Sequence, residues 1–166
     1  MSPNNTTLSW ASWAVQEANY RNMNLPISSY AFIHQRSFME ACGQTTKNFN
    51  LQQLGLYVGL CVEELKELTD AFSKIETGLR ENKPIHRADV AEVLDAAGDL
   101  IVVAGGVAVS CGVSPEEILN RVWATNFEKV GPDGKVIRRS DGKIMKPAGW
   151  SPPSFTDLAD KVLGNE

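Results

Sequence analysis

The segment Val62-Glu63-Glu64-Leu65-Lys66-Glu67-Leu68 sets three carboxylates among apolar residues, and the rest of the chain is interpreted around it. The surrounding residues, from Asn50 to about Asn82, have the pattern of one long helix, and Asn50 is a suitable N-cap. A helical wheel gives this helix an apolar stripe with six members: Tyr57, Cys61, Leu68, Ala71, Phe72 and Ile75. Glu64 falls inside the stripe. Because a buried carboxylate without a partner is unfavourable, the pattern indicates bound cations.

A second acidic helix is predicted from Ala88 to Gly112. Glu92, Asp95 and Asp99 share one face of it, since they follow a spacing of i, i+3 and i+7. The following run, residues 100–109, is apolar on all sides and is expected to be buried. Carboxylates on the core-facing sides of two helices predict a hard-cation site with oxygen ligands only, of the Mg²⁺ or Mn²⁺ type.

The remaining helices complete an all-α prediction for one domain, residues 1–166. We expect a short amphipathic helix from Leu8 to about Tyr20 within an N-terminal segment, residues 1–27. The core, residues 28–130, should hold four helices. The first should end at Gly43, and the last should start at Ser114-Pro115, which is a strong N-terminal signal.

Residues 131–166 differ in character and predict an extended C-terminal arm. Turn signals at 131–134 and 140–143 flank two short apolar segments, so a small hairpin is plausible. Trp150 and Phe155 need a surface to cover, on their own subunit or on a neighbouring one.

Composition excludes several classes of protein. The net charge of -4 and the scattered Lys and Arg residues argue against a nucleic-acid partner. The three cysteines form no CxxC pair, which favours reduced thiols and a cytoplasmic location, and we expect no signal peptide. The apolar run after Asp99 is interrupted by glycine and is too short to span a bilayer. His34 and His86 form no Glu-x-x-His pair, which argues against a di-iron carboxylate oxidase.

The order of the acidic motifs resembles a known family. Glu63-Glu64-x-x-Glu67 followed by Glu92-x-x-Asp95 is similar to the ExxE and ExxD signature of the MazG-like, all-α NTP pyrophosphohydrolase superfamily. Later segments resemble its phosphoribosyl-ATP-pyrophosphohydrolase-like branch. These segments are Leu94 to Asp99, Asn126-x-x-Lys129, Gly134-Lys135 to Lys146-Pro147, and Pro152-Pro153. The resemblance covers roughly residues 28–155.

The resemblance implies a Mg²⁺-dependent hydrolase, with Mn²⁺ as a possible substitute, built on a four-helix-bundle core. It would cleave an NTP or dNTP between the α and β phosphates to a monophosphate and pyrophosphate, as in nucleotide-pool sanitation. It also implies a homodimer or homotetramer. The metal ligands would be Glu64, Glu67, Glu92 and Asp95. Glu63, with Glu64, would be catalytic, as a ligand or as the base that prepares water, and Asp99 would belong to the substrate-binding set.

Asn126 and Lys129 are predicted to bind the substrate. They lie one turn apart on the last core helix, where Lys129 could hold a phosphate and Asn126 could bond ribose or phosphate. For the base, the sequence offers only Gln35, Phe38 and Gln44 as candidates. Each acidic cluster could instead be a solvated helix face or could interact with a helix dipole.

The sequence is also compatible with two other functions. The protein could hydrolyse phosphoribosyl-ATP, or it could be a non-catalytic helical scaffold that binds nucleotide.

Overall fold

The computed structural model describes residues 27–131 and 133–164, so the helix expected from Leu8 to Tyr20 lies outside the described residues. Five helices follow in order: α2 (Ile27–Ala41), α3 (Leu51–Arg80), α4 (Arg87–Ser110), α5 (Pro115–Phe127) and α6 (Thr156–Leu163). Within the described ranges there is no β-strand, and the packing is between helices. The predicted all-α class is confirmed.

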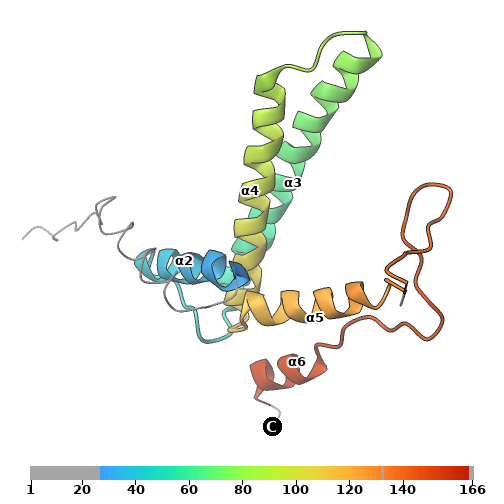
Figure 1. Cartoon of the computed structure of the whole chain (residues 1–166). Coiled ribbons are helices and arrows are strands. Elements are labelled where there is room, and N and C mark those ends of the chain that lie inside the picture. The colour runs from blue at the N-terminus through green and yellow to red at the C-terminus, as the bar shows by residue number, and fades with distance from the viewer. Residues whose placement is uncertain (1–26, 132, 165–166) are drawn as a thin grey trace, which may run out of the picture.

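Helices α3 and α4 form a long antiparallel hairpin that stands out from the rest of the chain (Figure 1). The N-cap prediction for α3 is confirmed, because the Asn50 side chain accepts a bond of 3.0 Å from the Gln53 amide. At the other end Asn82 adopts a positive φ of 54°, and the Lys83 amide donates to the Gly78 carbonyl at 2.8 Å. The chain then turns back into α4.

The base of the hairpin is closely packed because α4 carries two adjacent glycines there. A Cβ atom at Gly106 would lie 2.1 Å from the ring of Tyr57, and one at Gly105 would lie 2.2 Å from Gln35. The glycines therefore let α3 and α2 approach the backbone of α4. Met39 and Val109, which are fully buried, complete this core with Tyr57.

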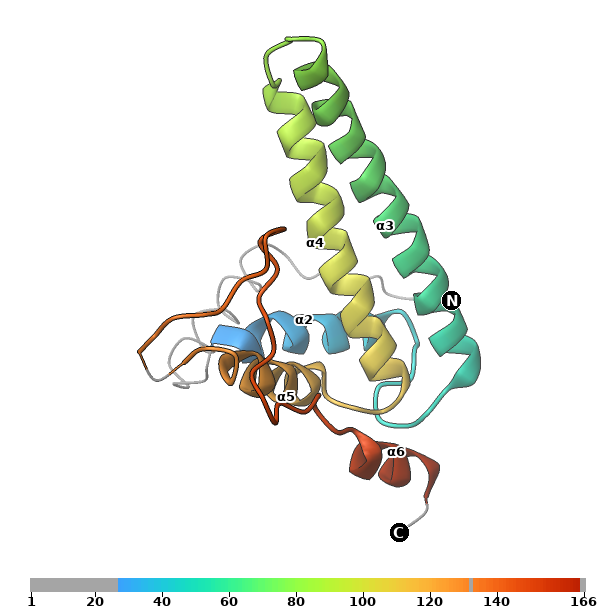
Figure 2. The same ribbon diagram turned by 90° about the vertical axis from the view of Figure 1, so that its right-hand side faces the viewer.

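Helices α2 and α5 contact α4 only near this base, as Figure 2 shows. In the described part of the chain, no further element lies along the outer half of the hairpin (Figures 1 and 2). The four core helices are present. In a single copy, however, α2 and α5 pack against the α3–α4 hairpin only at its base.

Because no other described helix covers the outer half of the hairpin, two burial predictions are wrong for the single chain. Phe72 was placed in the apolar stripe that faces the core, and it is 57% exposed. The run 100–109 was expected to be buried on all sides, but Ile101 is 60% exposed and Val102 is 48% exposed. Its buried members face α2 and α3, and its exposed members face away from both.

Helix α4 is long and apolar enough to cross a membrane, judged by length and composition, with a hydropathy of 1.7 over its most apolar stretch. Core helices of globular proteins meet the same criterion, and part of α4 is buried at the hairpin base. The feature therefore carries little weight as evidence for a membrane span.

The C-terminal arm forms the small hairpin that the turn signals predicted. Arg138 and Ile144 make an antiparallel bridge, and the Met145 amide donates to the Ile137 carbonyl at 2.8 Å. Trp150 covers its own subunit, because its indole N–H donates to the Thr125 carbonyl of α5 at 2.7 Å. The arm therefore has a defined fold and a fixed attachment.

Helix α6 was not predicted. Its apolar side places Leu158 in a buried position, and an ion pair joins Asp157 to Arg121 of α5 at 2.5 Å. The guanidinium lowers the pKa of the Asp157 carboxyl to about 2. Helix α6 is therefore held by contacts with α5. The sequence of its own eight residues does not reveal these contacts.

Candidate active site

The predicted carboxylates lie on α3 and α4 near the line where the two helices meet, and charges on both helices act on Glu64. Partial burial raises the pKa of the Glu64 carboxyl. The negative charges of four neighbours raise it further, and these are Glu67, Asp99, Glu63 and Asp95, with the strongest first. Residues from both helices therefore act electrostatically on one carboxyl group. Their spacing on each helix and the antiparallel pairing of the helices produce this arrangement.

A groove of about 340 Å³ runs between the two helices beside this cluster. Its acidic lining includes Glu67, Glu92 and Asp95, so it brings the remaining predicted ligand, Glu92, to the same place. A larger cavity of about 810 Å³ adjoins it toward the hairpin tip and shares Asp70 and Lys74 with it. The groove and the cavity together offer room for an extended anionic ligand next to the carboxylates.

Lys74 is a site residue that the sequence analysis missed. It lies in both cavities, and its ammonium group is paired with the Glu92 carboxylate, which raises the pKa of Lys74. Lys74 and Glu92 are brought together only by the register of α3 against α4, so no local sequence signal predicts the pair. Within the described ranges, Glu63, Glu64, Glu67, Asp95 and Asp99 have no ion pair.

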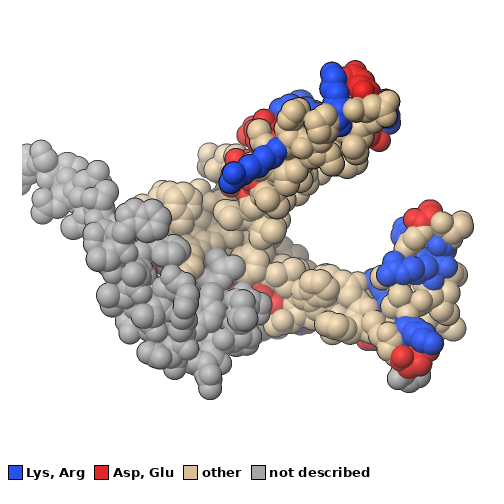
Figure 3. All heavy atoms as spheres, turned by 45° about the horizontal axis from the view of Figure 1, so that its top comes forward, with Lys and Arg blue, Asp and Glu red and all other residues tan. Residues whose placement is uncertain are grey.

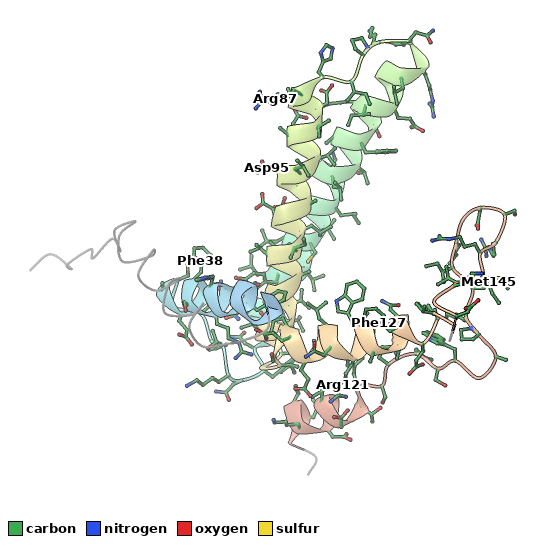
Figure 4. The ribbon with its side chains drawn as sticks, viewed as in Figure 1. Phe38, Arg87, Asp95, Arg121, Phe127 and Met145 are labelled. Carbon is green, nitrogen blue, oxygen red and sulfur yellow. The ribbon has the colours of Figure 1, made fainter. Side chains whose placement is uncertain are left out.

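Asn126 and Lys129 lie elsewhere in the single chain. The Lys129 ammonium group donates to the Asn126 side-chain oxygen at 2.6 Å and lies 5.0 Å from the centre of the Trp150 ring. Asn126 is in the last turn of α5, and Lys129 follows the end of that helix. Figure 4 shows the neighbouring Phe127 well away from Asp95, which projects from the middle of the hairpin. The predicted phosphate-binding pair and the predicted metal ligands are therefore not brought together within one copy.

The family profile of phosphoribosyl-ATP pyrophosphohydrolase matches residues 34–126, more than half of the chain. The match includes both acidic helices and the groove between them. This chain belongs to the phosphoribosyl-ATP pyrophosphohydrolase family. A comparison with curated proteins finds no significant match. Family membership supports pyrophosphohydrolase activity on a nucleotide-like substrate.

The donor set of this phosphoribosyl-ATP pyrophosphohydrolase family member suits a hard divalent cation. All the grouped donors are carboxylate oxygens, which Mg²⁺ and Mn²⁺ prefer, and their mutual repulsion is relieved by added positive charge. With the side chains in their present conformations, the described residues contain no three acidic, histidine or cysteine groups that are close enough to hold one ion. Glu63, Glu67 and Asp95 are exposed and make no ion pair in the described residues, so their side chains are free to turn toward an ion, whereas Glu92 would have to leave Lys74 to do so.

The three candidates for base recognition in this family member have other surroundings. The Gln35 amide donates to the Val102 carbonyl, and the Gln44 side-chain oxygen accepts from the Tyr57 hydroxyl at 2.8 Å. Both glutamines therefore hold the hairpin base together. Phe38 is 63% exposed. None of the three lines the groove between the acidic helices.

Proposed function

We propose that this protein is a Mg²⁺-dependent pyrophosphohydrolase that cleaves an NTP or dNTP between the α and β phosphates. The products would be a nucleoside monophosphate and pyrophosphate, which suits nucleotide-pool sanitation. The observation that carries the proposal is the convergence of carboxylates from α3 and α4 on Glu64, beside a groove. A scaffold has no need for such an arrangement, because like charges brought together destabilise the fold.

Each carboxylate has a proposed role. Glu64, Glu67, Glu92 and Asp95 would hold Mg²⁺, or Mn²⁺ in its place. Mg²⁺, when bound, neutralises phosphate oxygens and makes a water molecule more acidic. Without such an ion the acidic groove would repel a triphosphate.

Glu63 is the proposed general base. Its carboxylate would accept a proton as the water oxygen forms a bond to the α phosphorus. The bond from the α phosphorus to the bridging oxygen then breaks, and pyrophosphate leaves with that oxygen. Asp99, close to Glu64, would position the substrate by bonding its hydroxyl groups.

Lys74 gains a role in this scheme. In the present structure its ammonium group neutralises Glu92. A divalent ion that takes Glu92 as a ligand would compete with Lys74, which would then be available to a phosphate oxygen in the adjoining cavity. Asn126 and Lys129 are also proposed to bind the substrate, with Lys129 on a phosphate.

Phosphoribosyl-ATP is the second candidate substrate, and the family match favours it. It contains the same α–β phosphoanhydride bond, so the carboxylates would do the same work on it. The two substrates differ at the base and sugar. The carboxylates of the groove do not discriminate between these parts.

We also propose that the protein works in the cytoplasm as a homodimer or homotetramer. The exposed apolar residues along the outer half of the α3–α4 hairpin support self-association, because isolated chains rarely leave such a surface to water.

The test is an assay of purified protein with Mg²⁺ against the common NTPs and dNTPs, dUTP and phosphoribosyl-ATP. Pyrophosphate and orthophosphate are followed separately. We expect pyrophosphate release from one or a few of these compounds. Glu64→Gln should lower the rate at least about 100-fold. When carboxylates act as a unit, the loss of one removes most of the rate enhancement that they provide together. Glu76→Gln is the matched control, because Glu76 lies on the same helix and pairs with Arg80 outside the groove.

Three other outcomes have distinct meanings. Turnover of phosphoribosyl-ATP alone selects the second substrate. Orthophosphate release without pyrophosphate contradicts cleavage between the α and β phosphates. Nucleotide binding with no cleavage of any compound would support the non-catalytic scaffold.

A further inference from the structure

Two further cavities lie at the base of the α3–α4 hairpin. The first, of about 520 Å³, is bounded by α2, residues 47–49, the connection between α4 and α5, and α6. The second, of about 340 Å³, lies between that connection, α5 and α6. Figure 2 shows α6 beyond the hairpin base, at the opposite end of the molecule from the hairpin tip. We call them the polar cavity and the apolar cavity, and both are separate from the candidate active site.

The polar cavity has an excess of positive charge. Its cations are Arg36 of α2, Lys47, and Lys161 of α6. In the part of the chain that the structure describes, none of the three has a carboxylate partner. Glu117 is the one carboxylate among the described lining residues, and it is paired with Arg121 at 2.8 Å. The lining therefore has a net charge of +2 and favours an anion.

Cations of the hairpin, by contrast, mostly have carboxylate partners. Lys66 is paired with Asp70, and Arg80 is paired with Glu76 at 2.9 Å. Figure 3 shows Lys and Arg beside Asp and Glu over the hairpin. Pairs of this kind leave little charge for a ligand. The unpaired cations of the polar cavity remain available to a bound anion.

Arg36 is the cation of this cavity that most needs a partner. Its Nε atom is buried and makes no hydrogen bond within the described residues. A buried N–H group without a partner is unfavourable, and folded proteins satisfy nearly all such groups. Because Arg36 lines the polar cavity, its guanidinium can bind an anion there. The planar fork of a guanidinium matches the oxygens of a phosphate group.

The backbone around the polar cavity is held in place. Gly112 has a positive φ of 74°, and a Cβ atom there would lie 2.9 Å from the Lys47 carbonyl. The glycine therefore lets the α4–α5 connection lie against residues 47–48. The Asn50 amide also donates to the Ser110 carbonyl at 2.9 Å. These contacts fix the walls of the cavity without a ligand, which lowers the cost of ordering a site on binding.

The apolar cavity shares one wall with the polar cavity. Four residues line both, namely Cys111, Val113, Leu158 and Val162. Apart from Cys111, every described side chain that lines the apolar cavity is a hydrocarbon. A hydrocarbon group placed there leaves water at no cost in hydrogen bonds, whereas the polar edge of a nucleobase finds no partner. The occupant that suits this cavity is therefore aliphatic or aromatic.

We propose that the two cavities together bind a small amphiphilic anion, a phosphate monoester that carries a hydrocarbon group. The phosphate would lie among Arg36, Lys47 and Lys161, and the hydrocarbon would fill the apolar cavity. Three cations suit a phosphate, which has close to two negative charges near pH 7, better than a carboxylate. Each cavity has the size of a small-molecule site. The proposal gives the chain a second ligand site and does not depend on the pyrophosphohydrolase function.

Isothermal titration calorimetry of the full-length protein with methyl phosphate and butyl phosphate tests the proposal. EDTA is present, so that no divalent ion recruits phosphate to the carboxylates of the groove. Butyl phosphate should bind at least about 10-fold more tightly than methyl phosphate, because each buried methylene is worth roughly fourfold in affinity. Butanol should not bind measurably. Equal affinity for the two phosphates, or no binding of either, would overturn the proposal.

Variants of the polar cavity identify the cations that bind. Arg36→Met should weaken butyl phosphate binding at least about 10-fold, since it removes charge-assisted hydrogen bonds. Without ligand it should melt no lower than the wild type, because the unpaired buried N–H is gone. Lys161→Met, at an exposed position, should also weaken binding. Arg80→Met removes the same charge from the far end of α3 and should keep the wild-type affinity. Equal losses in all three variants would contradict a site at the hairpin base.

Cysteine alkylation locates the bound molecule. Cys111 lines both cavities, whereas Cys42 is exposed and is not among the residues that line either. Saturating butyl phosphate should slow the reaction of Cys111 with iodoacetamide and leave that of Cys42 unchanged, as followed by mass spectrometry of the peptides. Ala159→Phe places a larger side chain at the apolar cavity and should remove the preference for butyl over methyl phosphate. Unchanged reactivity of Cys111, or equal protection of both cysteines, would place the ligand elsewhere.

Discussion

At the residue scale, the most informative group is the Glu64 carboxyl, whose pKa is raised by partial burial and by the charges of Glu67 and Asp99. A raised carboxyl pKa means that the folded protein binds this proton more tightly than the unfolded chain. The resulting penalty is absent below the ordinary carboxyl pKa of about 4.3 and is complete above the raised value. Without metal, Glu64→Gln should therefore raise Tm at about pH 7.5 and leave it nearly unchanged at about pH 4.

Thermal melts in EDTA at both pH values check this prediction, with Glu76→Gln as the control. An equal change in Tm at the two pH values would show that the charge of Glu64 is not the cause.

Bound metal should stabilise the wild type, so removal of the metal should lower its Tm. Because an ion that binds only the folded state stabilises it by mass action, Mg²⁺ at 100 times its Kd should add about 2.7 kcal/mol. For a chain of this size we expect a rise in Tm of roughly 5–10 °C. Asp95→Asn should reduce the rise, and Glu76→Gln, which changes a residue outside the groove, should keep it. An identical response of wild type and Asp95→Asn to Mg²⁺ would argue against Asp95 as a ligand.

Spacing along each helix was enough to predict which carboxylates share a face. Glu64 was singled out because it falls on an apolar stripe, and partial burial together with neighbouring negative charges raises the pKa of its carboxyl. The pairing of Lys74 with Glu92 could not be predicted in the same way. It depends on how far α3 slides along α4, and that register is set by tertiary packing at the hairpin base.

At the element scale, the register of α3 against α4 depends on Gly106. A methyl group there would meet the Tyr57 ring at 2.1 Å, so Gly106→Ala should destabilise the protein by about 1–3 kcal/mol through overpacking. Gly55→Ala on α3 is the matched control. Its Cβ meets nothing within 4 Å, and alanine should stabilise that helix by about 0.5–1 kcal/mol. Urea unfolding curves measure both, and a similar result for the two variants would contradict the close packing at Gly106.

Helix ends were predictable where their signals are local. Asn50 bonds the Gln53 amide, as an N-cap should, and Gly43 follows the end of α2 with a positive φ of 74°. Helix α6 was missed because its stability comes from other elements. Arg121 of α5 binds Asp157 and also lies 5.9 Å from the centre of the Phe155 ring. Eight residues without such contacts are too few for a stable helix.

At the scale of the whole molecule, the sequence predicted the all-α class but not which surfaces remain open. An apolar residue on a helix is assigned to a core, and the sequence does not say whether that core belongs to one chain or two. Phe72 and Ile101 were both assigned to the core and are both exposed here. Their hydrophobic pattern is the same as that of Tyr57 and Val103, which α4 and α3 do bury.

The exposed residues of α3 follow a pattern that specifies helix pairing. Val58, Leu65, Phe72 and Leu79 recur at intervals of seven residues, and each is about half exposed. Apolar residues at every seventh position form one stripe along a helix, which suits packing against a further helix, and α4 leaves this stripe of α3 exposed. Phe72→Glu should therefore lower the mass of the particle in light scattering coupled to size exclusion, without loss of helix in circular dichroism. Thr69→Glu, which adds the same charge between repeats, should lower it less. A mutant with the mass of the wild type, or a monomeric wild type, would show that the seam does not hold copies together.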